Sequence, residues 1–426
     1  MKQPVLIVGM EPRITIPIAR SLHRYGIPVE TASLSSAEPS PHSRAIRDFT
    51  LLPIPSDNPA AFSRALTELI KKKKFDMLIP ATDAALGAIS AHDSDLRRLL
   101  HVGCPAPHVV QRVLNKSLTL EIAEKCGIKV PGTFRAENLA ELDALAGKLE
   151  FPVVAKPFHK SKETDFKVRY FKSIDELRSA MKADDQLGSR IMLQEYCQGD
   201  GVGVEMLIHE GQPVATFQHR RLKEVPSTGG AAVVAIAEET DPDLAQQAFS
   251  LLRALEWEGV AMVEFRFDPS TRRSALMEVN GRYWGTLSLP IHAGVDFPLY
   301  EWQLAHGELP NVPATYAVGI RWRWTAGYIR RWHGLVKSSA KKALSRPSVL
   351  KQLLPSLSDV NPGTGDSLFC WRDPMPMVSE TCRAITGALT SDLSGIFRKG
   401  RTQHRANKAT EPAAVHLKSD IKENVH

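Results

Sequence analysis

Two carboxylates, an amide and an arginine lie close together in one short stretch of the sequence. Residues 260–282 have the pattern of two strands joined by a tight turn. Because side chains alternate along a strand, Glu264 points to one face of the first strand. Glu278, Asn280 and Arg282 share one face of the second. Carboxylate and amide oxygens suit Mg²⁺ when substrate phosphates complete its ligands, and an arginine complements phosphate charge. The pattern indicates a magnesium–nucleotide site, the alternative being an ordinary half-buried hairpin with one polar face and no metal.

Two lysines lie where a bound anion would stabilise them. Lys156 follows the apolar run Val153–Ala155, and a lysine that faces a protein interior is costly unless an anion partners it. Lys116 lies one residue inside a predicted helix start, where free backbone N–H groups also attract anions. A bound phosphate would explain both positions. The alternatives are a strand-end lysine that extends to solvent, for Lys156, and an ordinary surface lysine, for Lys116.

Two predicted strand ends carry further polar residues. Glu195, Tyr196 and Cys197 end a strand that runs into a glycine-containing loop. Such a segment can present backbone N–H and C=O groups to a purine edge, although many strand–loop–strand connections look similar. Arg220 and Arg221 end a later strand, and adjacent arginines suit a carboxylate or an acyl phosphate. A solvated strand terminus is the alternative for this pair.

The elements that must position these residues divide the chain into five predicted regions. Residues 1–105 alternate strands and helices, which predicts an α/β domain with a parallel sheet; no GxGxxG dinucleotide signature follows its first strand. Residues 106–190 form a small α+β module. Residues 191–310 carry strands, a helix and the acidic hairpin. Residues 311–400 form a basic extension that we expect to be helical, and 401–426 have the composition of a disordered tail.

Composition argues against several classes of protein. Five cysteines in 426 residues form no CxxC pair and no His/Cys cluster, which disfavours zinc sites and a disulfide framework. The chain has no apolar window of about 18 residues and no signal-peptide pattern, so we expect a cytoplasmic protein without a transmembrane segment. The net charge of +7 suits anionic ligands such as nucleotides. We expect no nucleic-acid partner, because no stacking motif accompanies the charge.

An arginine- and tryptophan-rich segment at 321–332 has two interpretations. Basic amphipathic helices that contain tryptophan can lie at membrane surfaces. Packing against the rest of the protein or against a second subunit is favoured, because apolar residues are interleaved with the charges. Peripheral membrane contact therefore stays the weaker alternative, and a homo-oligomer is left open.

The order of these features resembles the ATP-grasp superfamily over roughly residues 1–310. Members of that superfamily include biotin carboxylase, carbamoyl phosphate synthetase and D-alanine–D-alanine ligase. The most specific part of the resemblance is Glu264 followed by Glu278-Val279-Asn280-Gly281-Arg282, and locally the chain looks most like carbamoyl-phosphate-synthetase-like ligases. The resemblance implies a mixed α/β and α+β chain with an ATP-grasp fold behind a Rossmann-like N-terminal domain.

The resemblance also implies roles for the site residues. One or two Mg²⁺ ions, with Mn²⁺ as an alternative, would be held by Glu264, Glu278 and Asn280. Arg282 would stabilise the transferring γ-phosphoryl group, and the pair of adjacent arginines adds Arg220 as a second catalytic candidate. The residues that would bind ATP are Lys116, Lys156, Glu195, Tyr196, Cys197 and Asp200.

These roles together predict an ATP-dependent ligase. It would phosphorylate a small-molecule carboxylate and couple the acyl phosphate to an amine or another nucleophile. The alternatives are bicarbonate or carbamate activation, and a non-catalytic ATP-binding regulator. Two features depart from the family pattern. The loop at 158–165 lacks the glycines that cover the phosphates in many relatives, and Asp200 is only the nearest candidate for contact with the ribose hydroxyls.

Overall fold

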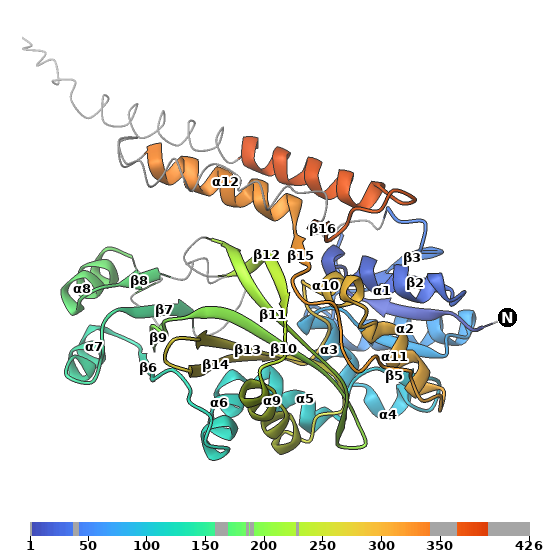
Figure 1. The fold of residues 1–426 in the computed structure, drawn as a ribbon, viewed down its shortest axis with the longest axis horizontal. Coiled ribbons are helices and arrows are strands. Elements are labelled where there is room, and N and C mark those ends of the chain that lie inside the picture. Colours follow the sequence, from blue (N-terminus) through green and yellow to red (C-terminus); the bar gives the residue numbers. More distant parts are fainter. Residues whose placement is uncertain are drawn as a thin grey trace, which may run out of the picture.

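The computed structural model describes residues 2–36, 42–157, 169–184, 187, 191–226, 230–340 and 364–390. Within these ranges three sheets form the framework of the molecule (Figure 1). The loop at 158–165, residues 227–229 and the 401–426 tail lie outside the described residues. None of the described helices is long and apolar enough to span a membrane.

The N-terminal sheet is parallel and has the strand order β3-β2-β1-β4-β5. Its strands are β1 (Val5–Val8), β2 (Val29–Ser33), β3 (Asp48–Leu51), β4 (Met77–Pro80) and β5 (His101–Val102). The helices of this region are α1 (Pro12–Arg24), α2 (Pro59–Lys73), α3 (Asp83–Ser90), α4 (Asp93–Leu96) and α5 (Pro107–Leu114). Strands β1, β2 and β4 are buried along their whole length, as expected when a parallel sheet is covered on both faces. This Rossmann-like arrangement confirms the predicted fold class of the N-terminal region.

The largest sheet forms the centre of the molecule and has the order β14-β13-β10-β11-β12-β15-β16. Its strands are β10 (Asp200–His209), β11 (Gln212–Val225), β12 (Ala231–Glu238), β13 (Gly259–Asp268), β14 (Arg273–Asn280), β15 (Arg321–Arg323) and β16 (Thr364–Asp366). The helices associated with it are α6 (Lys116–Lys125), α9 (Pro242–Ala254), α10 (Ser288–Ala293) and α11 (Phe297–Ala305). One face contributes Val204 and Phe265 to a core shared with α9. The other contributes Phe217 and Met262 to a core shared with Trp284.

The smallest of the three sheets is antiparallel and has the order β6-β9-β7-β8. Its strands are β6 (Thr133–Ala136), β7 (Val153–Pro157), β8 (Arg169–Phe171) and β9 (Ile191–Glu195), with helices α7 (Leu139–Leu145) and α8 (Ile174–Ala183). It has its own core, in which Leu142 and Leu177 pack on Val153 and Leu193. In Figure 1 this module lies beside the β13–β14 end of the large sheet, away from the N-terminal sheet.

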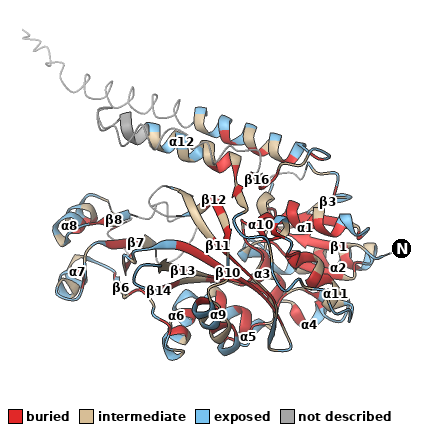
Figure 2. Cartoon of the chain, in the orientation of Figure 1, coloured by how far each residue is buried: buried red, intermediate tan, exposed pale blue. Residues whose placement is uncertain are grey.

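The region beyond residue 311 differs from the predicted helical extension, because it also lengthens the large sheet. Strand β15 pairs with β12, and β16 pairs with β15. Trp322 and Trp324 are buried in the core. Helix α12 (Thr325–Ala340) and a last helix at 375–390 lie along the top of the molecule in Figure 1. Figure 2 shows that both helices keep exposed faces.

Candidate active site

The acidic hairpin brings two carboxylates face to face. Glu264 on β13 pairs directly with Glu278 on β14, so the two side chains share one face of the sheet. The Asn280 amide lies next to both: its Nδ2 is 3.2 Å from Oε1 of Glu264 and 3.5 Å from Oε1 of Glu278. Like charges opposite each other on neighbouring strands destabilise a sheet. This pair therefore requires compensating charge.

Two cations from distant segments supply that charge. Lys116 Nζ lies 2.8 Å from Glu278 Oε2, and Arg221 forms an ion pair with Glu264. Burial acts to lower the pKa of Lys116, but the charge and hydrogen bond of Glu278 raise it overall. Burial likewise opposes the charge on Arg221, yet Glu264 and Glu224 raise its pKa. Both side chains stay charged, so they neutralise the acidic pair.

Lys116 reaches the pair because α6 begins beside β14. Asn115 caps this helix: its Oδ1 accepts hydrogen bonds from Ser117 N at 3.1 Å and Leu118 N at 3.4 Å. The chain after α6 is tied to β14 by a hydrogen bond of 2.8 Å from Leu276 N to Lys129 O. These contacts place the lysine against a glutamate that lies 162 residues later in the sequence.

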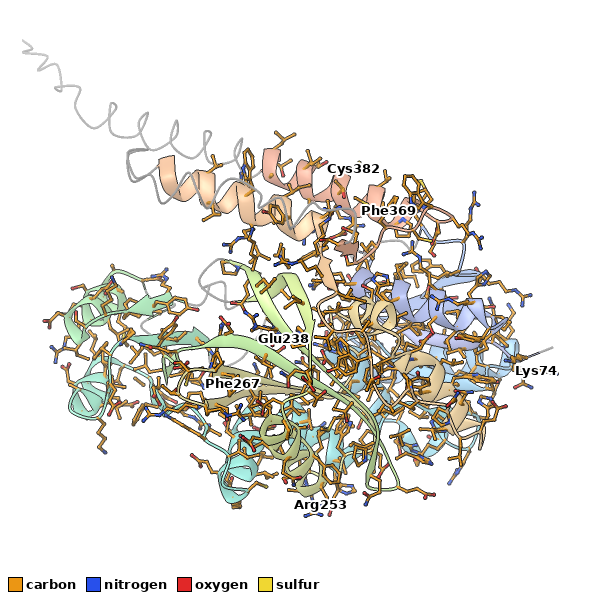
Figure 3. The ribbon with its side chains drawn as sticks, viewed as in Figure 1. Lys74, Glu238, Arg253, Phe267, Phe369 and Cys382 are labelled. Carbon is orange, nitrogen blue, oxygen red and sulfur yellow. The ribbon has the colours of Figure 1, made fainter. Side chains whose placement is uncertain are left out.

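The two adjacent arginines of β11 point to opposite faces of the sheet, as alternation along a strand requires. Arg221 reaches Glu264. Arg220 pairs instead with Asp200 at 3.1 Å and with Glu238 at 2.6 Å; Glu238 is labelled in Figure 3. The structure therefore does not bring Arg220, a predicted catalytic residue, or Asp200, a predicted ATP-binding residue, to the acidic pair. It brings Arg221 there.

Strand register explains this placement. Gly203 on β10 pairs with His219 on one side and with Glu264 on the other, so His219 and Glu264 share a face. Arg221 follows His219 by two residues and therefore lies on the same face. The sequence pattern suggested that this strand ends at Arg220 and Arg221, whereas it continues to Val225. Local sequence carries no signal that selects Arg221, because the register depends on how β10 pairs with its two neighbours.

A buried pair that the sequence did not indicate lies on this same face. His219 Nδ1 is 2.5 Å from Glu205 Oε1, and both side chains are fully buried. Burial raises the pKa of Glu205, although the neighbouring imidazole acts to lower it. Gly203 leaves the space that the imidazole occupies, since a Cβ at this glycine would lie 2.4 Å from His219 Cε1. The pair supports the strands directly beside Glu264.

Arg282 connects the hairpin with the N-terminal domain. Its Nε donates to Oδ1 of Asp83 at 2.8 Å, and its Nη1 donates to the Tyr283 carbonyl at 2.8 Å. Asp83 begins α3, directly after β4, and Thr82 caps that helix by accepting from Ala85 N. The carboxyl end of a parallel strand is the edge at which open α/β sheets bind ligands. This edge therefore meets the hairpin, and Asp83 is a site residue that sequence reasoning missed.

Lys156 and Glu195 lie on neighbouring strands of the small sheet. Lys156 Nζ donates to Oε1 of Gln194 at 2.6 Å. Glu195 is bound to Gly132 twice: its backbone N donates to the glycine carbonyl at 2.8 Å, and its Oε2 accepts from the glycine N at 3.1 Å. The structure thus places these two predicted ATP-binding residues in one module, and the acidic pair in another.

Tyr196 and Cys197 follow the end of β9. The Tyr196 side chain is 42% exposed, and its ring lies edge-on to Tyr170 with 5.9 Å between ring centroids. Cys197 is half-buried, and burial raises the pKa of its thiol. An exposed ring and a neutral thiol present a largely apolar surface at this strand end, which suits a planar base.

The acidic pair supplies only part of the ligand set of a divalent cation. Among the described residues, no group of three or more His, Cys, Asp and Glu side chains could bind a metal ion alone. Glu264, Glu278 and Asn280 offer two carboxylates and one amide oxygen. Mg²⁺ keeps several water or phosphate ligands and is commonly bound through one or two carboxylates. The donor set therefore fits magnesium that arrives with phosphate groups.

Sequence comparison finds relatives for parts of the chain. Residues 188–327 match the family described as ATP-grasp in the biosynthetic pathway with Ter operon. The urea amidolyase of Lachancea kluyveri is 27% identical over 197 residues, which cover 42% of this chain and 10% of that protein. The chain thus matches only a small part of this relative. The D-alanine–D-alanine ligase of Acidiphilium cryptum is 25% identical over 238 residues, which cover 52% of this chain and 78% of the ligase.

Solved structures share the fold over most of the chain. An L-amino acid ligase from Bacillus licheniformis superposes with a TM-score of 0.56 and 19% identity, covering 71% of this chain and 74% of the ligase. An N5-carboxyaminoimidazole ribonucleotide synthetase in complex with ADP superposes with a TM-score of 0.59 and 14% identity, covering 80% and 85%. At these identities the likeness establishes the fold: an ATP-grasp fold preceded by a Rossmann-like domain.

Proposed function

We propose that this chain, which has an ATP-grasp fold and matches an ATP-grasp family over residues 188–327, is an ATP-dependent ligase that activates a small-molecule carboxylate and joins it to an amine. The names of two similar proteins support a carboxylate–amine ligase. One is a D-alanine–D-alanine ligase and the other an L-amino acid ligase. Turnover measurements with a panel of substrates would identify the carboxylate and the amine.

The observation that carries the proposal is the acidic pair and its compensation by two cationic side chains. Glu264 and Glu278 face each other beside Asn280, and Lys116 and Arg221 neutralise them. These oxygen donors would hold Mg²⁺, or Mn²⁺ in its place, together with phosphate oxygens. The chemistry supplied at these residues would be neutralisation of the negative charge on the phosphoryl group during its transfer.

Lysine and arginine have a second role when the nucleotide is bound. ATP carries several negative charges, so its phosphates compete with Glu278 for Lys116. Arg221 would likewise leave Glu264 if that carboxylate bound a metal ion in its place. Lys116 would then contact the phosphates, and Arg221, with Arg282, would contact the substrate carboxylate and the acyl phosphate. The protein contributes position and charge, not a covalent nucleophile.

The reaction has two balanced steps. A carboxylate oxygen attacks the γ-phosphorus of ATP; a P–O bond forms, the bond to the β-phosphate oxygen breaks, and ADP leaves. The amine nitrogen then attacks the acyl carbon of the acyl phosphate. A C–N bond forms, the bond from carbon to the phosphate oxygen breaks, inorganic phosphate leaves, and the nitrogen gives up a proton to solvent.

The nucleotide would lie between the two modules that carry the predicted residues. Lys156 on β7 would contact the phosphates, and Glu195 would orient the strand end through its two hydrogen bonds to Gly132. Tyr196 and Cys197 would offer backbone groups and an apolar surface to adenine. Asp200 remains a candidate for the ribose hydroxyls only if it separates from Arg220 when ATP binds, because the two form an ion pair at 3.1 Å.

Turnover with a panel of substrates tests the proposal. ADP release is measured with Mg-ATP across amino acids, with and without a second amine, and with bicarbonate as a separate arm. We expect a carboxylate–amine pair to stimulate release, and Glu278→Gln to abolish that stimulation. Asp268→Asn is the matched control, because this half-buried aspartate is the last residue of β13 in the same hairpin, where it accepts hydrogen bonds from Ser270 and Thr271.

The possible outcomes separate the alternatives. Stimulation by bicarbonate alone would replace the ligase with bicarbonate or carbamate activation. ATP binding without turnover on any substrate would favour a regulator. Full activity of Glu278→Gln would remove the metal role of the acidic pair.

A further inference from the structure

The last helix, residues 375–390, carries an apolar stripe on its outer face. The residues of this stripe, here called the seam, are Met375, Val378, Cys382, Ile385 and Leu389. Their spacing alternates between three and four residues, which is the a/d pattern of a coiled coil. All five are exposed, with exposed fractions of 51% for Met375, 47% for Val378, 45% for Ile385 and 60% for Leu389. Isolated exposed apolar residues are ordinary, but an ordered stripe of them is not.

The opposite face of this helix already packs on the body of the protein. Glu380 is buried and lies 2.8 Å from Arg330 of α12, and Ala384 is buried in the core. At about 100° per residue, Glu380 lies on the other side of the helix from Cys382 and Leu389. Figure 3 labels Cys382 on this helix, at the edge of the molecule. The seam therefore points away from the contacts that attach the helix.

We propose that the seam pairs with the seam of a second copy of this chain, so that the protein is a homodimer. The a/d spacing specifies a helix as the partner. The positions that flank the seam are Ser379, Thr381, Thr386 and Ala388, all uncharged, so two copies approach without like-charge repulsion. A membrane surface would instead require basic residues beside the apolar stripe. Arg383 of this helix forms an ion pair with Glu380 at 3.4 Å.

The seam is also symmetric about its central residue. Met375 and Leu389 lie seven residues on either side of Cys382. In a parallel in-register pair of helices, Cys382 lies opposite Cys382 of the second copy. The same is true of an antiparallel pair that is centred on this residue. A twofold interface places the same surface on both partners, which this arrangement satisfies in either orientation. Trp371, which is 87% exposed just before the helix, adds apolar surface beside it.

Cross-linking of the full chain through Cys382 tests the pairing. Mild oxidation should give a disulfide-linked dimer from the wild type and none from Cys382→Ser. Cys104 serves as an internal control: burial raises the pKa of its thiol to about 12, so it should not react. Without oxidant, sedimentation should give a mass of twice 47.1 kDa at concentrations of about 100 µM.

Charged substitutions give a second, independent measurement. Ile385→Asp with Leu389→Asp should reduce the sedimentation mass to 47.1 kDa. Leu309→Asp is the matched control, because Leu309 is an isolated apolar residue that is 89% exposed, and this variant should remain dimeric. A wild-type monomer at about 100 µM would overturn the proposal. A dimer that persists in the variant with both Ile385→Asp and Leu389→Asp would also overturn it. A monomer that pellets with anionic vesicles, tested with phosphatidylglycerol in phosphatidylcholine, would assign the seam to a membrane surface instead.

Discussion

The acidic hairpin and the seam differ in where their partners come from. At the hairpin, Glu264 and Glu278 are compensated by Lys116 and Arg221, which other segments of the chain supply. At the seam, five apolar side chains of a single helix stay exposed. The first arrangement needs the whole fold, and we propose that it exchanges its internal cations for a ligand. The second is complete in local sequence, and we propose that its partner is a second copy of the chain.

Separate methionine substitutions of the two adjacent arginines of β11 should give the largest difference in kcat. Arg221→Met removes the cation that faces Glu264, so we expect kcat for ADP release to fall by about 100-fold or more. Arg220→Met breaks partly exposed pairs with Asp200 and Glu238, and should cost less than about tenfold. Arg221→Lys keeps the charge and should recover part of the loss. Equal effects of the two methionine variants would contradict the assignment of Arg221 to the site.

Gly203→Ala should destabilise the centre of the sheet. The added Cβ would lie 2.4 Å from His219 Cε1 and 3.1 Å from Met262 Sδ, so the free energy of unfolding should fall by about 1–3 kcal/mol. Urea denaturation measures this change. Gly147→Ala is the control, because nothing lies within 4 Å of a Cβ at that position. An unchanged midpoint for Gly203→Ala would mean that the imidazole does not occupy the space over this glycine.

Lys116→Met should change the affinity for Mn²⁺ in opposite directions with and without ATP. Without ATP the lysine competes with a metal ion for Glu278, so its removal should raise the affinity for Mn²⁺ by up to about tenfold. With ATP present the same variant should bind Mn²⁺-ATP more weakly, because a phosphate contact is lost. Mn²⁺ electron paramagnetic resonance measures both affinities. A change in the same direction with and without ATP would rule out the exchange of partners.

A change at the seam should have the smallest effect on chemistry. Ile385→Asp alters a helix that contributes no residue to the acidic pair, so kcat should stay within about twofold of the wild type. Steady-state ADP release at saturating ATP checks this. A large loss of turnover would join the two regions into one functional unit and end the contrast between them.

Local patterns were sufficient to predict the hairpin and the α/β character of the N-terminal region, whereas the ATP-grasp fold was predicted from the family resemblance. Alternation placed Glu264, Glu278 and Asn280 on one face, and the structure pairs Glu264 directly with Glu278. The predicted start of α6 at Lys116 is also observed, with Asn115 as its cap. These features depend on neighbours in sequence, which is the information that periodicity and capping patterns contain.

Features that depend on long-range register could not be predicted in this way. No local pattern distinguishes Arg221 from Arg220, because the choice follows from how β10 pairs with both β11 and β13. Asp83 meets Arg282 only because the N-terminal domain packs against the large sheet. Strand β12 was not predicted, and β15 is only three residues long. Strand β15 forms because it pairs with β12, not because its residues have a high strand propensity.

The central claim is that Glu264, Glu278 and Asn280 form a magnesium site whose ligand set is completed by bound ATP. Calorimetric titration of ATP with and without Mg²⁺, in the wild type, Glu278→Gln and Asp268→Asn, tests it most directly. The account predicts that Mg²⁺ strengthens ATP binding in the wild type and in Asp268→Asn, and that Glu278→Gln loses this dependence while its fold is retained. An ATP affinity that is independent of Mg²⁺ in the wild type, or equally dependent on it in all three proteins, would contradict the account.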